Sequence, residues 1–546
     1  MFSKQLYVTG LRPFIIVLLV LGIFFRFVNL DRKVYWIDEV HTSVRVAGYG
    51  KQEFVDLIPK AQVIGIEEFQ KYQRLTPERD LGDALNSLAG NSEHSPFYYL
   101  MARFWMQWFG SSVVVTRSLA AFISLLAFPC LYWLSQELFA SPLVGWMAIA
   151  LMAVSPFHIL YAQEARQYSL WAVTILLSSA TLLWALRDRD EKRPVSKWAI
   201  YALTVAAGLY AHLLFAMTLL GHGIYLIVRE GWREKAAKSR LVAYLLASLA
   251  GIIAFLPWLV LFVNDSDGIG GWVARKMPFA TLIQRWAINL SSLFLDIQIG
   301  FSERLFDIES VQDTIKLDLG NPFTYLILLI LGLIGYSIYF LCRHTEKHVW
   351  LFILTLILIP GLILALPDLI SGGQRSTIGR YLTPCYLGIQ LAVAYLFATK
   401  ITSLDVRVGQ QKLWQVVIAV LVSLGVLSCA IASQAETWWN KYSCYDNPQL
   451  AQFINQAPSP LIISSPEKAS RLTSLSYELK PSVGFLLLED PNQLKIPNSF
   501  TDVFLFRPSE EFIQALEQHP AYKVEPVPQL RNLWQLVMGT SRGWQK

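Results

Sequence analysis

Two adjacent carboxylates, Asp38 and Glu39, follow the aromatic pair Tyr35 and Trp36, just after the first long apolar run of the chain, 14–30. Tyr and Trp prefer the membrane–water interface, so this position indicates the point where the chain leaves a bilayer. A carboxylate placed there can act as a general base toward a hydroxyl, or it can ligate a divalent cation. We therefore treat Asp38 and Glu39 as candidate catalytic residues. The alternative is that both are solvated loop residues.

Three further clusters carry groups that suit the same chemistry: His94 with Pro96; Gln163 and Glu164 with Arg166 and Tyr168; and Arg380 with Arg375 in the glycine-rich loop before it. The planar guanidinium group of arginine binds phosphate through two hydrogen bonds. Carboxylates and arginines on one membrane face fit a reaction between a lipid phosphate and an external nucleophile. Asp38 and Glu164 are also the candidate ligands for a divalent cation, and a simpler alternative for Arg380 is an interfacial charge that extends toward water.

Other charged residues have structural interpretations. Arg26 and Arg117 fall near the outer ends of predicted spans and can extend to the interface in the same way. His212 lies between two predicted spans, where a hydrogen-bonded structural histidine is the expected role.

The composition identifies the setting in which these residues act. The chain has 546 residues, of which 54% are hydrophobic and 13% aromatic, too many for an ordinary soluble protein. Apolar windows of about 20 residues recur, each long enough to cross a hydrocarbon core. The net charge of +6 comes from Lys and Arg in short loops, which argues against a nucleic-acid partner. The five cysteines suggest no disulfide framework, and the first apolar run has no small-residue cleavage site and is expected to remain as a span.

We predict a polytopic α-helical membrane protein with about eleven spans, at 13–30, 112–138, 143–157, 168–187, 197–211, 213–229, 241–263, 322–341, 349–366, 380–399 and 413–433. Four connecting segments are basic and are expected in the cytoplasm: 187–197, 229–240, 343–348 and 400–412. Counting from them places the N-terminus inside, and Asp38, His94 and Glu164 together on the outer face. The segment 96–109 is short for a span and should lie as an amphipathic helix in the outer interface.

The predicted domains are a transmembrane module, 1–433, and an extracytoplasmic α/β domain, 434–546. The module carries two large outer loops, 31–111 and 264–321, the second with an amphipathic stretch from residue 279. In the tail we expect strands at 461–465, 483–488, 502–506, 522–527 and 532–537, with a helix at 510–519. The tail contains no nucleotide-binding motif, so a structural or acceptor-docking role is expected for it.

The series of motifs resembles the membrane glycosyltransferases with the GT-C fold. It consists of Tyr35-Trp36-Ile37-Asp38-Glu39, His94-Ser95-Pro96-Phe97-Tyr98-Tyr99, Ser155-Pro156-Phe157 with Gln163-Glu164-Ala165-Arg166-Gln167-Tyr168, and Arg380-Tyr381-Leu382-Thr383-Pro384. Within that group the chain is similar to the protein O-mannosyltransferase and aminoarabinose transferase branch, or glycosyltransferase family 39. The resemblance covers roughly 1–400. Many relatives have His-Pro-Pro where this chain has His94-Ser95-Pro96, a mild departure.

The resemblance implies a plasma-membrane enzyme that takes a sugar from a polyprenyl phosphate at the outer face, with inversion, and delivers it to an acceptor that the sequence leaves open. It implies Asp38 as the catalytic carboxylate, and no nucleotide is needed. Beside it, Glu39 and Glu164 would position the acceptor or help to hold a cation, while Arg166, Arg380 and Arg375 would bind the phosphate. His94, Tyr168 and Gln163 would position donor or acceptor.

A transporter or lipid flippase is the alternative function, since membrane charges serve transport as well. Transport predicts ionisable residues near mid-membrane and internal repeats, whereas the charges here gather at one face.

Overall fold

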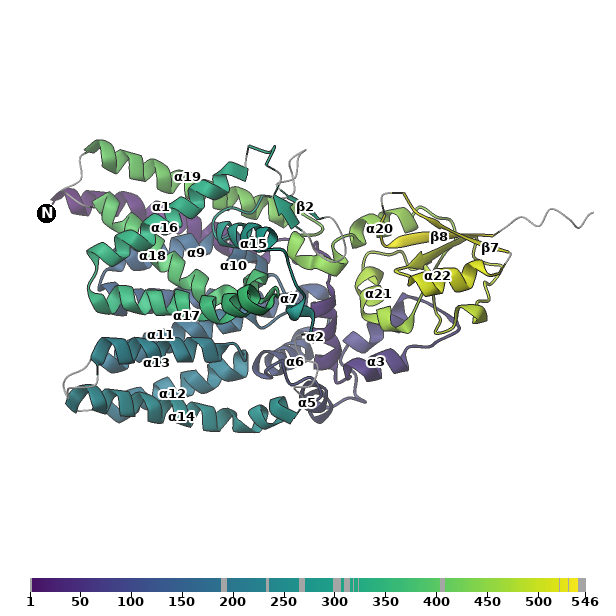
Figure 1. The fold of residues 1–546 in the computed structure, drawn as a ribbon, viewed down its shortest axis with the longest axis horizontal. Helices are drawn as coiled ribbons and strands as arrows, with labels where there is room; N and C mark the ends of the chain where they lie inside the picture. The colour runs from purple at the N-terminus through teal and green to yellow at the C-terminus, as the bar shows by residue number, and fades with distance from the viewer. Residues whose placement is uncertain are drawn as a thin grey trace, which may run out of the picture.

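Long apolar helices packed side by side form the larger part of the molecule, and a smaller α/β part adjoins one end of the bundle (Figure 1). The computed structural model describes residues 2–187, 194–231, 235–264, 271–297, 306–308, 315–317, 319–322, 324–402, 408–519, 521–528 and 530–538. Part of the predicted outer loop 264–321 therefore lies outside the described residues. Between residues 298 and 318 the described residues are those of a two-stranded pair, β2, Phe306–Ile308, and β3, Ile315–Leu317.

The helices of the bundle follow the apolar runs of the sequence. They are α1 (Phe2–Phe27), α7 (Val113–Leu125), α8 (Ala127–Phe139), α9 (Pro142–Ala153), α10 (Pro156–Ala162), α11 (Tyr168–Arg187), α12 (Pro194–Ala211), α13 (Phe215–Glu230), α14 (Lys235–Asn264), α16 (Thr324–His344), α17 (Lys347–Ser371), α18 (Thr383–Thr402) and α19 (Val408–Gln434). The run predicted at 143–157 is not straight, because α9 and α10 meet at an angle of 62° next to Pro156. Proline lacks the backbone N–H that would continue the helix, which explains a break at this point.

Among the described residues, seven helical segments are long and apolar enough to cross a membrane, or eight if α9 and α10 form one broken span. The helices α12 and α13 lie among these segments, with α12 against α11 and α14, and α13 against α17. The class of polytopic helical membrane protein is confirmed at this level. The predicted number of eleven spans stays a prediction.

Short helices gather at the end of the bundle that faces the α/β part (Figure 1). They are α2 (Ile37–Ala47), α3 (Lys51–Leu57), α4 (Ile66–Gln70), α5 (Leu81–Ala89) and α6 (Phe97–Phe109), and α15 (Phe279–Ser291) lies in the second loop. The segment predicted as an interfacial helix is α6. It has 13 residues, buries Tyr98 and Tyr99, and exposes Phe104, Trp108 and Phe109. An exposed aromatic face of this kind fits the membrane interface.

The tail folds around a six-stranded sheet with the order β1-β5-β4-β6-β8-β7. Its strands are β1 (Val63–Ile64), β4 (Pro460–Ser464), β5 (Gly484–Leu487), β6 (Asp502–Phe506), β7 (Tyr522–Pro526) and β8 (Leu533–Met538), and its helices are α20 (Asn447–Ile454), α21 (Ala469–Ser476) and α22 (Glu510–Glu517). Strand β4 pairs in parallel with β5 and β6, and the other pairings are antiparallel. The five strands expected in the tail are present, whereas β1 comes from the first loop and was not expected.

The apolar core of the tail continues into the first loop. On one face of the sheet, Ile462 and Phe485 pack in one buried cluster with Val40 and Val44 of α2. The hydroxyl group of Ser474 in α21 donates a hydrogen bond of 2.6 Å to the backbone carbonyl of Tyr35. The α/β part therefore fixes α2, the helix that begins at the Asp38 motif.

Candidate active site

A cavity of about 510 Å³ lies where α2 approaches the ends of the bundle helices. We call it the Asp38 cavity. Its lining consists of Asp38, His41, Arg45, Lys51, Asn91, Glu93, His94, Arg166, Gln167, Tyr168, His212, Leu213, Leu214, Phe262, Val273, Leu364, Arg375, Arg380 and Tyr381. Six of the nine site residues expected from the sequence are thus brought together: Asp38, His94, Arg166, Tyr168, Arg375 and Arg380.

Arg380 and Asp38 form an ion pair inside this cavity. Nη2 of Arg380 lies 3.7 Å from Oδ2 of Asp38, and the two side chains are 6% and 26% exposed. The guanidinium group also lies over the ring of Trp36 at 5.6 Å and that of Tyr168 at 5.7 Å. Aromatic faces attract a cation and hold it in place. Nε of Arg380 is buried without a hydrogen-bond partner among the described residues, so the group retains a donor for a ligand.

Arg166 approaches the same carboxylate segment from the loop between α10 and α11. Its Nη1 donates to the backbone carbonyl of Asp38 at 3.3 Å and to Oγ1 of Thr42 at 3.2 Å. The rings of Tyr99 and Tyr168 lie 6.0 and 5.9 Å from its guanidinium carbon. Its Nε is also buried without a partner in the described part of the chain. Two guanidinium groups with an unused donor each therefore flank Asp38.

Arg375 and His94 also line the cavity. Nη1 of Arg375 lies 3.2 Å from Oδ1 of Asp368, whose other oxygen accepts hydrogen bonds from the backbone and hydroxyl of Ser376, both of 2.7 Å. His94 has its Nε2 3.5 Å from Oε1 of Glu93. Burial, and then the charge of Arg45, lower the pKa of His94 well below its usual range. His94 is therefore a neutral imidazole, suited to hydrogen bonding rather than to charge.

Glu39 is not part of the cavity lining, although it adjoins Asp38. Its two carboxylate oxygens accept hydrogen bonds of 2.8 and 2.7 Å from Arg117, and both side chains are almost wholly buried. Oε1 also accepts a bond of 2.9 Å from the backbone N–H of Ala165. Burial acts to raise the pKa of Glu39, but the charges of Arg117 and Lys441 outweigh it, so the pKa is lowered. Glu39 links α2 to the loop that carries Arg166.

Glu164 and Gln163 are held away from the cavity in the same junction. Oε1 of Glu164 accepts hydrogen bonds from Nζ of Lys441 at 2.6 Å and from Asn440 at 2.8 Å. Gln163 accepts a bond of 3.0 Å from Lys33 and donates to two backbone carbonyls at the end of α1. These contacts fasten the loop to the chain on either side of it.

The suggested cation site of Asp38 and Glu164 is not formed, because only Asp38 lines the cavity while Glu164 is paired with Lys441. No group of three or more His, Cys, Asp or Glu suited to a metal occurs among the described residues. We therefore derive no step through a metal.

The interpretation of Arg26 and Arg117 as residues that extend to the interface is wrong. Both side chains are buried. Arg117 donates to the carbonyls of Leu30 and Val34 as well as to Glu39. Arg26 donates to backbone oxygens in α1 and α9. Each guanidinium group has enough acceptors to be stable inside the protein, which a span prediction cannot detect. His212 accepts a hydrogen bond from the backbone of Leu214, as expected, but it also lines the Asp38 cavity.

The cavity residues that sequence reasoning missed include His41, Arg45 and Lys51. A signal was available, because positions 38, 41 and 45 share one face of a helix. The short helix α2 was not expected in the first loop, so this spacing was not used.

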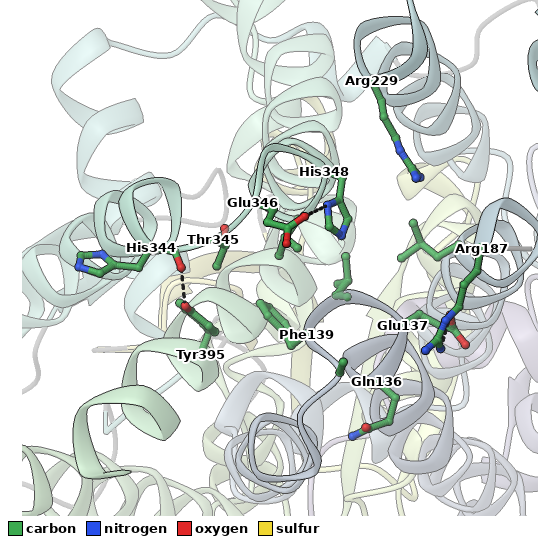
Figure 2. Close-up of a pocket in the computed structure, with 14 residues that line it drawn as sticks. Gln136, Glu137, Phe139, Arg187, Arg229, His344, Thr345, Glu346, His348 and Tyr395 are labelled. Atoms are coloured by element: carbon green, nitrogen blue, oxygen red, sulfur yellow. Dashed lines mark hydrogen bonds and ion pairs between the residues drawn. The ribbon is translucent and has the colours of Figure 1, made fainter. Parts of the chain in front are cut away.

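A second cavity, of about 390 Å³, lies at the opposite end of the bundle. Figure 2 shows it between the ends of several helices, with Arg187 beside Glu137 at 3.5 Å and His348 beside Glu346 at 3.3 Å. Its lining contains none of the site residues expected from the sequence. The charged residues drawn there are largely paired with one another, which suits a role in joining helix ends.

Comparison with known proteins agrees with the expected resemblance. Residues 93–261 match the family model described as dolichyl-phosphate-mannose-protein mannosyltransferase. The fold is similar to that of apo ArnT from Cupriavidus metallidurans, with 12% identity, a TM-score of 0.50 and coverage of 96% of this chain and 98% of that one. The same ArnT bound to undecaprenyl phosphate gives a TM-score of 0.49 at 12% identity, over 98% and 99% of the two chains.

The Archaeoglobus fulgidus oligosaccharyltransferase in its apo form has 11% identity to this chain and a TM-score of 0.45, over 87% of this chain and 64% of that one. No curated protein matches the sequence.

Fold and cavity together define a class: a largely membrane-embedded helical protein with an ArnT-like GT-C fold and an arginine-rich cavity at one end. The resemblance to the GT-C glycosyltransferases is confirmed.

Proposed function

We propose that this protein is an inverting glycosyltransferase that moves a sugar from a polyprenyl phosphate to an acceptor hydroxyl at the outer face of the plasma membrane. One observation carries the proposal: the Asp38 cavity brings a carboxylate together with two buried guanidinium groups, each with an Nε that has no partner among the described residues. The family model of residues 93–261 describes an enzyme that uses a sugar on a polyprenyl phosphate, which supports the same donor class.

Each side of the reaction has a residue suited to it. Asp38 accepts the proton of the acceptor hydroxyl, whose oxygen then attacks the anomeric carbon. The bond from that carbon to the phosphate oxygen breaks, and the lipid phosphate leaves with the electron pair. Arg380 and Arg166 stabilise the charge that develops on the phosphate, a role for which fixed donors in a site sheltered from water are effective. A single displacement of this kind inverts the sugar.

The remaining site residues support these groups. Arg375, held by Asp368, adds a cation at the edge of the phosphate site, and His94 and Tyr168 orient donor or acceptor. Glu39, Glu164 and Gln163 act through position, because their contacts join α2 to the loop of Arg166. Their effect on catalysis is indirect.

The proposal includes a topology of eleven spans with the N-terminus in the cytoplasm. It places the Asp38 cavity and the α/β domain, 434–546, outside. The basic segments near Arg187 and Arg229 support it, since both residues line the second cavity, at the end of the bundle opposite the Asp38 cavity.

Transport is less well supported than transfer. It would use ionisable groups within the bundle that are free to bind a substrate. Arg26 donates four hydrogen bonds to protein atoms, and His158 is hydrogen-bonded to Gln390 at 2.9 Å. Both groups are engaged in packing instead.

The direct test is to incubate the purified protein with a series of undecaprenyl phosphate sugars and membrane extract. Mass spectrometry then follows the loss of sugar from the donor and its appearance on lipid, glycan or protein. Transfer that depends on Asp38 supports the proposal. Vesicle-to-vesicle or cross-bilayer movement of the lipid without any transfer would contradict it and favour a flippase.

A further inference from the structure

The Asp38 cavity has more positive charge than a single lipid phosphate requires. Five cationic side chains line it, Arg45, Lys51, Arg166, Arg375 and Arg380, against two carboxylates. Asp38 lies beside Arg380, Asp368 pairs with Arg375 from outside the lining, and Glu93 lies beside the neutral imidazole of His94. The proposed phosphate site uses three of the cations. Arg45 and Lys51 remain without an assigned role.

Arg45 and His41 present unused polar atoms on the α2 side of the cavity. Arg45 is 3% exposed, and its Nη2 donates to Oδ1 of Asn91 while its Nη1 is buried without a partner among the described residues. His41 likewise has a buried Nε2 with no partner in the described chain. Leaving a charged donor buried and unsatisfied is costly, so an arrangement of this kind is expected where a ligand completes it.

Arg45 and His41 extend the polar lining along α2, beyond Asp38. Arg45 follows Asp38 by seven positions on α2, and a helix rises 1.5 Å per residue, which separates their backbones by about 10 Å. Charge-assisted hydrogen bonds span about 2.7–2.9 Å. The donors of the cavity therefore extend along α2 over more than the reach of one phosphate oxygen, from the Asp38 end to Arg45.

We propose that the Asp38 cavity binds a second anionic group, a carboxylate or phosphate, at Arg45, His41 and Lys51. The group belongs to the substrate pair of the reaction, either as a substituent on the transferred sugar or as part of the acceptor. This inference rests on the proposed function, and it narrows the substrate class to a pair that carries a negative charge beyond the lipid phosphate.

Binding of inorganic phosphate to the lipid-loaded protein tests the second site. The purified protein is saturated with undecaprenyl phosphate in detergent and titrated with inorganic phosphate by calorimetry at constant ionic strength. We expect a saturable site with one phosphate per protein. Arg45→Gln and Lys51→Gln should each weaken it about tenfold or more, since a hydrogen bond to a charged group contributes about 1.5–3 kcal/mol.

Lys71→Gln is the matched control, because Lys71 is an exposed lysine of the same loop that is paired with Glu68 and does not line the cavity. It should leave phosphate affinity unchanged. Equal losses in Lys51→Gln and Lys71→Gln, or no saturable phosphate binding by the lipid-loaded wild type, would overturn the second site. The thermal unfolding temperature of each variant identifies misfolding, and the surface variant Lys51→Gln decides the question should Arg45→Gln fail to fold.

The two failures are distinguishable. A wild-type protein that binds no undecaprenyl phosphate overturns both the proposed function and the second site. A wild-type protein that binds the lipid in a manner dependent on Arg380, yet binds no phosphate, overturns the second site alone.

A comparison of two donors, undecaprenyl phosphate glucose and undecaprenyl phosphate glucuronate, shows whether the sugar or the acceptor carries the second anionic group. If the anion is on the sugar, the glucuronate donor prevents phosphate binding, and Arg45→Gln weakens that donor alone. If the anion is on the acceptor, both donors leave the phosphate site open and bind wild type and Arg45→Gln alike.

Discussion

Arg380 and Asp38 face each other across the candidate active site, with Nη2 3.7 Å from Oδ2. The base and the phosphate-binding group are therefore neighbours before any substrate enters. A phosphate at Arg380 would therefore lie close to the Asp38 carboxylate, so that one pair of residues positions both the leaving group and the base.

Asp38→Asn should abolish most of the transfer activity while leaving the donor bound. A positioned base contributes about 10²–10⁴-fold to rate, so single-turnover transfer should fall at least by the lower figure. Donor affinity should stay the same or rise, because a negative charge beside Arg380 is removed. Asp38→Glu should retain part of the activity. Wild-type transfer by Asp38→Asn would show that another group is the base.

Arg380→Ala should weaken the binding of undecaprenyl phosphate about tenfold or more, as expected for the loss of a charged hydrogen bond of about 1.5–3 kcal/mol. Arg343→Ala is the control, since Arg343 is exposed at the end of α16 opposite the cavity. Affinities measured by titration in detergent should separate the two variants. Identical affinities would remove Arg380 from the phosphate site.

Glu39→Gln should destabilise the protein strongly. It leaves the buried charge of Arg117 without its partner, and breaking a buried ion pair in this way costs about 3–5 kcal/mol. Glu489→Gln removes an exposed pair with Lys60 and should have a much smaller effect, because water screens exposed charges. Thermal unfolding in detergent compares them. A small effect for Glu39→Gln would mean that the junction does not depend on this pair.

The buried amine of Lys33 should make the folded protein more stable as the pH rises. Burial, and then the charges of Lys441 and Arg117, lower the pKa of Lys33 to about 7, below its value in the unfolded chain. Between about pH 7 and pH 10 the unfolded state binds more protons, so this residue adds stability as pH rises through that window. Lys33→Met should remove that contribution. We expect the unfolding temperature of wild type to rise from pH 7 to pH 9 relative to Lys33→Met, and parallel curves would contradict the assignment.

Cysteine labelling should place both ends of α6 on the same side of the membrane. Asn86 and Ser112 are exposed on either side of this helix, and Gln410 lies near the start of α19 at the opposite end of the bundle. Membrane-impermeant maleimide applied outside should label cysteines at 86 and 112 but not at 410. Accessibility of 86 and 112 from opposite sides would mean that α6 spans the membrane.

Much of this fold was predictable because its signals are local. Apolar runs such as those at Tyr168–Arg187 and Thr324–His344 are visible without any partner, and short apolar strands such as Asp502–Phe506 are bounded by turn residues. The strand β1 was not predictable. It has two residues and exists through its pairing with β5, which is far away in the sequence.

The residues of the site also differ in whether the sequence alone could identify them. Asp38, Arg166 and Arg380 could be identified, since polar groups at membrane boundaries stand out against apolar runs. Glu39 and Glu164 could not be separated from them by sequence, because what distinguishes them is a partner. Glu39 is neutralised by Arg117 and Glu164 by Lys441, and both partners lie many residues away. Arg45 escaped notice because its role depends on α2 being a helix.

The pairing of β1 with β5 imposes an order on biosynthesis. The ribosome makes Val63 and Ile64 several hundred residues before their partners Leu486 and Phe485. Until the tail is complete, Ile64 and Phe69 have no sheet to cover them. These apolar side chains of the first loop therefore stay exposed until the last part of the chain has been synthesised and folded. A nascent or truncated chain should be recognised by chaperones and proteases at this loop, so that only a full-length molecule keeps an assembled Asp38 cavity.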